Sequence, residues 1–76
     1  MKLQLYTKPG CPLCEEAREL LEELRHDLTF DLEIVNIYES QQLFDRYRYR
    51  VPVIRRGETD VLELKFTLEE LRRALT

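Results

Sequence analysis

Two cysteines separated by two residues are the part of this sequence best suited to chemistry. They form Cys11-Pro12-Leu13-Cys14 and are the only cysteines in a chain of 76 residues. Proline is favoured at the first position of a helix, so Pro12 predicts a helix for which Cys11 is the N-cap. An N-cap side chain accepts hydrogen bonds from the N–H groups two and three residues further on, here those of Leu13 and Cys14. These donors and the positive end of the helix favour the thiolate of Cys11 over its thiol.

Cys14 is expected to lie beside Cys11 on the same face of this helix. Residues three apart on a helix are about 5–6 Å apart, which is within the range of a disulfide. Cys14 should be the more shielded of the two, because its neighbours on that face are core residues. The pattern predicts that Cys11 attacks a substrate disulfide and that Cys14 resolves the mixed disulfide by attacking the Cys11 sulfur. Lys8 either folds its ammonium over this site or points to water.

Two other interpretations of the cysteine pair are a zinc site shared by two chains and a pair of inert core cysteines. A structural zinc site usually takes four Cys or His ligands. The chain has two Cys and one His, so no metal site is expected within one chain. In a short chain without a signal peptide, this spacing is more typical of a redox site than of a framework disulfide.

The hydrophobic pattern predicts one α/β domain spanning residues 1–76. The first two strands should be parallel and joined by a right-handed crossover, and the last two should form an antiparallel hairpin. A Thr67-x-x-Glu70 capping box marks the start of the last helix, with Phe66 and Leu71 at staple positions. This βαβαββα order predicts a four-stranded mixed sheet with helices on its faces. The elements are expected at strand 3–6, helix 12–27, strand 32–37, a helix from about 40, strands 51–54 and 60–65, and a helix from about 68.

Charge and hydropathy exclude several classes of protein. Fifteen acidic and twelve basic residues give a net charge of −3, which argues against a strongly basic nucleic-acid binder. No apolar run approaches the ~18 residues of a membrane helix, and residues 1–6 lack the apolar segment of a signal peptide. We therefore expect a soluble, cytoplasmic protein with neither nucleic-acid nor membrane partners.

Charges are unevenly distributed along the chain. Residues 15–39 hold nine acids and two arginines, whereas residues 46–56 hold five arginines. The run Arg46-Tyr47-Arg48-Tyr49-Arg50 is typical either of a nucleic-acid surface or of the C-terminal end of a helix, where cations complement the helix dipole. The acidic net charge favours the second interpretation. A third hypothesis is that Arg46 or Arg50, close to Pro52, binds a carboxylate of glutathione or of an acidic partner protein.

Residues 6–14, Tyr-Thr-Lys-Pro-Gly-Cys-Pro-Leu-Cys, followed by Val51-Pro52, a hairpin and a last helix, resemble the glutaredoxins. The resemblance covers nearly the whole chain and implies a thioredoxin fold with Cys11 as nucleophile, Cys14 as resolving cysteine and a cis-proline at Pro52. It also implies that the backbone of Val51 pairs with the substrate like a short added strand. The residues implied in substrate binding are Lys8, Pro12, Leu13, Val51 and Pro52, with Leu13 at a position where the family usually has tyrosine.

The sequence departs from glutaredoxins that use glutathione. Arg50 replaces the threonine of their Thr-Val-Pro, Leu62 and Glu63 occupy the positions of a Gly-Gly pair, and Lys65-Phe66 that of an aspartate. Half of the glutathione site is therefore expected to be absent. We expect a monomeric thiol–disulfide oxidoreductase without a cofactor, acting on protein disulfides or glutathione mixed disulfides, with glutathione as one candidate co-substrate. The alternative is a binding module without enzyme activity, either an iron–sulfur carrier that uses Cys11 and an external thiol or a nucleic-acid-associated domain.

Overall fold

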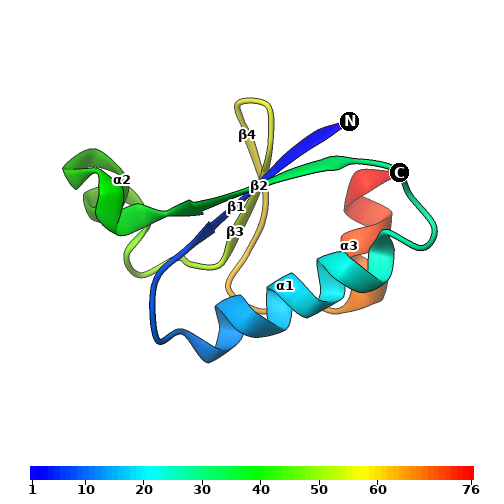
Figure 1. Cartoon of the computed structure of the whole chain (residues 1–76), viewed down its shortest axis with the longest axis horizontal. Coiled ribbons are helices and arrows are strands. Elements are labelled where there is room, and N and C mark those ends of the chain that lie inside the picture. The colour runs from blue at the N-terminus through cyan, green and yellow to red at the C-terminus, as the bar shows by residue number, and fades with distance from the viewer.

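A four-stranded mixed sheet forms the centre of the computed structural model, which describes residues 1–76 (Figure 1). The strand order is β2-β1-β3-β4. β1 pairs in parallel with β2, β3 is antiparallel to β1, and β4 is antiparallel to β3. The predicted sheet is confirmed. The elements are β1 (Lys2–Thr7), α1 (Pro12–Leu24), β2 (Asp31–Asn36), the 3₁₀ helix η1 (Ile37–Glu39), α2 (Gln41–Tyr47), β3 (Val53–Arg56), β4 (Thr59–Glu63) and α3 (Leu68–Leu75).

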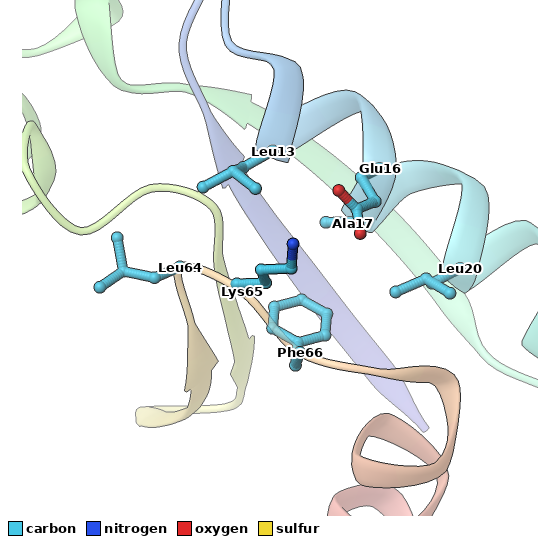
Figure 2. Close-up of a pocket in the computed structure, with 7 residues that line it drawn as sticks. All are labelled: Leu13, Glu16, Ala17, Leu20, Leu64, Lys65 and Phe66. Carbon is cyan, nitrogen blue, oxygen red and sulfur yellow. The ribbon is translucent and has the colours of Figure 1, made fainter.

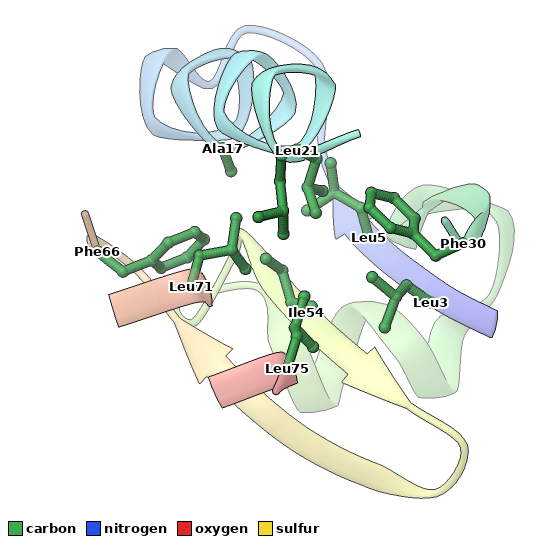
Figure 3. Close-up of a cluster of buried hydrophobic side chains, with 10 residues drawn as sticks. Leu3, Leu5, Ala17, Leu21, Phe30, Ile54, Phe66, Leu71 and Leu75 are labelled. Atoms are coloured by element: carbon green, nitrogen blue, oxygen red, sulfur yellow. The ribbon is translucent and has the colours of Figure 1, made fainter. Parts of the chain in front are cut away.

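Helices α1 and α3 cover the same face of the sheet (Figure 1). Their apolar side chains meet those of β1 and β3 in the main core, because residues 3 and 5 of β1 point to one face and the residues between them to the other. Figure 3 shows the side chains of α1 converging on those of α3 and the strands. No helix is long and apolar enough to cross a lipid bilayer. The cluster consists of Leu3, Leu5, Ala17, Leu21, Leu24, Phe30, Ile54, Phe66, Leu71 and Leu75.

The predicted capping box at the start of α3 is confirmed. The Glu70 N–H donates to Thr67 Oγ1 at 3.1 Å, and the Thr67 N–H donates to Glu70 Oε1 at 3.1 Å. Phe66 and Leu71, at the staple positions, are both buried in the main core. This start fixes how α3 meets α1.

A second, smaller core joins the cysteine site to α2. Tyr6 of β1 meets Tyr47 of α2 edge-on, with ring centroids 4.9 Å apart and planes at 88°. Aromatic pairs favour this edge-to-face geometry. Cys14, Val51 and Val53 lie in the same cluster, so the packing of α2 on the sheet also positions the cysteine helix and the segment that precedes β3.

Several element boundaries differ from the predicted ones, and hydrogen bonding explains two of these differences. The first helix ends at Leu24 rather than Asp27, because the Leu24 carbonyl accepts from the N–H groups of both Asp27 and Leu28 at 3.0 Å and the chain closes into a turn. The third strand begins at Val53 rather than Val51. The Val51 N–H is bonded to the Tyr47 carbonyl at the end of α2 (3.1 Å), and a proline at position 52 has no N–H to pair.

Leu64 is the only residue other than glycine with a positive φ, +65°. It follows β4, and its N–H donates to the Pro52 carbonyl at 2.8 Å. We expect Leu64→Gly to be more stable than Leu64→Ala by about 1 kcal/mol, because both variants lose the leucine side chain but only glycine adopts this φ without strain. Urea unfolding of the two variants tests this. An alanine variant equal to or more stable than the glycine variant, the order found inside helices and strands, would contradict it.

Candidate active site

The N-terminus of α1 presents the sulfur of Cys11. Gly10 turns the chain with a φ of +68°, and Cys11 is extended, with φ −110° and ψ 105°. The Cys14 N–H donates to Cys11 Sγ at 3.2 Å. Pro12 takes the first helical position, as predicted. Cys11 is thus the N-cap, although the bond predicted from the Leu13 N–H is not formed.

The two cysteines lie in different environments. Cys11 is half-buried, whereas Cys14 is only 3% exposed. Both are free thiols. Burial first, and then the neighbouring Cys11 side chain, raise the pKa of Cys14 to about 12. Cys14 therefore keeps its proton at neutral pH while Cys11 faces solvent.

The raised pKa of Cys14 makes the stability of the reduced protein depend on alkaline pH. An unfolded cysteine titrates near 8.5, so above that pH the unfolded chain loses a proton that the folded chain keeps up to a pH of about 12. The contribution of Cys14 to stability is complete below about pH 8.5 and declines as the pH rises. We expect the free energy of unfolding of the reduced protein to fall by about 1–2 kcal/mol more than that of Cys14→Ala between about pH 8.5 and 10.

Urea unfolding of both proteins under a reductant, at several pH values, measures this difference. Cys14→Ala is the matched control because all other titrating groups stay in place. Parallel loss of stability in the two proteins would show that Cys14 is not the cause.

Cys11 lies in an open groove of about 390 Å³. The groove brings together the loop before α1, the first residues of α1 and the segment that follows α2. Two cations and no carboxylate line it, in a chain whose net charge is −3. Its lining residues are Lys8, Gly10, Cys11, Pro12, Leu13, Arg48, Tyr49 and Val51.

Four of the five residues expected to bind substrate line this groove, namely Lys8, Pro12, Leu13 and Val51. The Lys8 ammonium is hydrogen-bonded to the Arg48 carbonyl at 3.4 Å. Pro52 is fully buried and does not line the groove. The Val51–Pro52 peptide bond is cis, as the resemblance implied. Because the Val51 N–H is already bonded to the Tyr47 carbonyl, a substrate strand that uses this donor must displace that bond.

Arg50 is bound by two carboxylates of β4 and does not face the groove. Its guanidinium lies 2.8 Å from Asp60 Oδ2 and 3.1 Å from Glu63 Oε1, both on β4. These two carboxylates raise the pKa of Arg50. Neither Arg50 nor Arg46 lines the groove, so neither arginine of the carboxylate-binding hypothesis is placed beside Cys11.

Arg48 and Tyr49 line the groove, although the sequence predicted no role for them at the cysteine site. Arg48 is the C-cap of α2, and both side chains are exposed beside the Cys11 loop. The position where α2 ends, at Tyr47, determines that these two residues reach the groove. The chain leaves the helix axis just after this point. The alternating Arg–Tyr pattern alone does not separate Arg48 from its two neighbouring arginines.

A second hollow near the site offers no binding volume. In Figure 2, Leu13, Glu16, Ala17 and Leu20 of α1 line one side, and Leu64, Lys65 and Phe66 line the other. The space between them does not admit a water molecule. It is a packing seam between α1 and the segment before α3.

The topology and the paired cysteines at the start of α1 define a thioredoxin-fold protein with a dithiol site. Thioredoxin 1 from the thermophilic eubacterium Thermosipho africanus has this fold and aligns with a TM-score of 0.69 over 99% of this chain and 90% of that chain, at 15% identity. The predicted thioredoxin fold is therefore confirmed.

Residues 2–76 match the model of the Glutaredoxin-like domain family, and the chain belongs to that family. A structural-genomics target protein from X. campestris is 34% identical, with a TM-score of 0.81 over 96% of this chain and 93% of that chain. This family and two nearby cysteines support a role in thiol redox chemistry.

Proposed function

We propose that the protein is a thiol–disulfide oxidoreductase that reduces protein disulfides or glutathione mixed disulfides. The observation that carries the proposal is the half-buried Cys11 at the N-cap of α1, with a backbone N–H 3.2 Å from its sulfur and a buried thiol three residues further on. An N–H donor and a helix N-terminus suit the anionic sulfur that attacks a disulfide.

The reaction proceeds in two exchanges. The Cys11 thiolate attacks one sulfur of the substrate disulfide, the S–S bond breaks, and the other sulfur leaves as a thiolate. Cys14 then loses its proton to solvent and attacks the Cys11 sulfur, which releases the second substrate thiolate. The substrate gains two electrons and the protein is left with a Cys11–Cys14 disulfide. Two glutathione molecules or a protein dithiol restore the reduced form. A reducing compartment such as the cytoplasm suits this role.

Two assays with purified protein test the proposal. One follows reduction of insulin with dithiothreitol as donor, and the other follows bis(2-hydroxyethyl) disulfide with glutathione and glutathione reductase. We expect the wild type to accelerate at least one of them and Cys11→Ser to match the reaction without protein. Acceleration of the second alone indicates glutathione as donor. No acceleration in either assay would refute the function.

A further inference from the structure

The cations beside Cys11 have no acidic partner in the protein. The ion pairs use Arg25, Arg50, Arg55, Arg72 and Arg73. Lys8 and Arg48 are outside this set, although both line the groove. In a chain of net charge −3, an acid-free groove with two unpaired cations attracts negative groups to the reactive sulfur.

Two aromatic rings contact the Arg48 guanidinium. Its guanidinium carbon lies 5.5 Å from the centre of the Phe44 ring and 4.8 Å from that of the Tyr49 ring. These two cation–π contacts orient the guanidinium and leave its N–H groups available to a carboxylate, which they bind in a two-point geometry. Because the side chain is already ordered, less rotamer entropy is lost on binding.

Aromatic side chains continue this surface away from Cys11. Phe44 contacts Tyr38, with ring centroids 5.5 Å apart, and both rings line a shallow surface depression on α2. Tyr38 is 56% exposed and Tyr49 is 78% exposed. A substrate that reaches Cys11 and also covers these rings must extend along the surface, as a polypeptide segment does.

We infer that the groove selects polypeptide disulfides flanked by acidic residues, with Arg48 as the residue that binds the flanking carboxylate and Lys8 adding charge beside it. The inference rests on the proposed function and specifies its substrate class. The carboxylate near the disulfide pairs with the guanidinium while the neighbouring substrate residues lie on Tyr49 and Phe44. The exchange at Cys11 is unchanged.

The test compares two peptide disulfides of equal length that carry either Asp or Lys on both sides of each cysteine. Rate constants for reaction with the reduced protein are measured by stopped flow, alongside bis(2-hydroxyethyl) disulfide and oxidised glutathione. We expect the Asp peptide to react about tenfold faster than the Lys peptide at low ionic strength, and the ratio to approach one in about 0.5 M salt. Arg48→Glu should lower the ratio below one, and Arg48→Gln should give an intermediate value.

Arg56→Glu is the matched charge-reversal control. Arg56 is exposed and unpaired, but it pairs in the sheet with Leu3, at the opposite end of β1 from the cysteine loop. We expect it to keep the wild-type preference for the Asp peptide.

Each other outcome decides against the inference. A wild-type ratio near one, with the uncharged disulfide still reacting, overturns it and leaves the proposed function intact. Equal effects of the Arg48 and Arg56 variants overturn it as well. Faster reaction of oxidised glutathione than of the Asp peptide, with the same loss in Arg48→Glu, assigns the cation to a tripeptide instead of a polypeptide. No reaction with any disulfide removes both the inference and the proposed function.

Discussion

Cys14→Ser is expected to stop the reaction with a protein disulfide at the mixed disulfide. Cys11 keeps its sulfur, its N-cap position and the N–H of residue 14, so the first exchange proceeds. No second sulfur then attacks Cys11, and the adduct accumulates in stoichiometric amount. Intact mass after mixing with an excess of protein disulfide detects the adduct, and steady-state turnover with dithiothreitol kept low falls by orders of magnitude.

Cys11→Ser is the matched control, because it makes the same replacement of sulfur by oxygen at the other cysteine. It should form no adduct, since Cys14 is only 3% exposed and burial, the largest cause of its raised pKa, is unchanged in this variant. An adduct on Cys14 in this variant would reverse the assigned roles. Added glutathione should release the substrate from the Cys14→Ser adduct, because an external thiol replaces the missing one. Failure to release it would mean that glutathione has no access to the site.

The parts of the site that could be predicted from sequence depend on neighbours in the chain. The N-cap at Cys11 follows from Pro12, and the start of α3 follows from the Thr67–Glu70 spacing. In each case one or two hydrogen bonds span three residues, so the local sequence contains both partners. The parallel pair β1–β2 and the antiparallel hairpin β3–β4 were predicted as well, because the change between helical and strand periodicity sets the order of elements. The central pairing of β1 with β3 was not predicted.

The parts that could not be predicted depend on contacts between distant residues. Arg48 and Arg50 are two residues apart and chemically identical, yet one lines the groove and the other is bound to β4. The difference arises where α2 ends, because Arg48 caps the helix and Arg50 lies beyond the turn, opposite Asp60. The left-handed conformation of Leu64 was equally hidden, since leucine has no preference for it.

Asp60→Ala is expected to lower the stability of the protein more than Glu63→Ala does. Asp60 and Glu63 are the two carboxylates that bind Arg50. Asp60 lies 2.8 Å from both Arg50 and Arg55 and accepts from the Tyr47 hydroxyl at 3.3 Å. Burial and the Asp60 carboxylate raise the pKa of Tyr47, which keeps this donor protonated. Removing Asp60 leaves Arg55 without its carboxylate and Arg50 with Glu63 alone.

The matched control is Glu63→Ala, because Glu63 binds the same Arg50 but has a side chain 42% exposed, against 21% for Asp60. We expect Asp60→Ala to lose about 2–3 kcal/mol, less than a fully buried pair because water still reaches the arginines. Glu63→Ala should lose about 0.5 kcal/mol, as surface pairs do. A domain of this size has a total free energy of unfolding of about 4–11 kcal/mol. Thermal unfolding therefore distinguishes the two variants.

The ion pairs of Arg50 are also expected to affect substrate binding, because Arg50 directly precedes Val51 and Pro52. If Asp60 positions this segment beside the groove, Asp60→Ala should raise the KM for a protein disulfide at temperatures where the variant remains folded, whereas Glu63→Ala should change it little. Equal losses of stability in the two variants would show that exposure does not set the strength of these pairs. An unchanged KM in Asp60→Ala would show that the Arg50–Asp60 pair has only a structural role. The position of Val51 would then be set by its hydrogen bond to the Tyr47 carbonyl and by its packing in the smaller core.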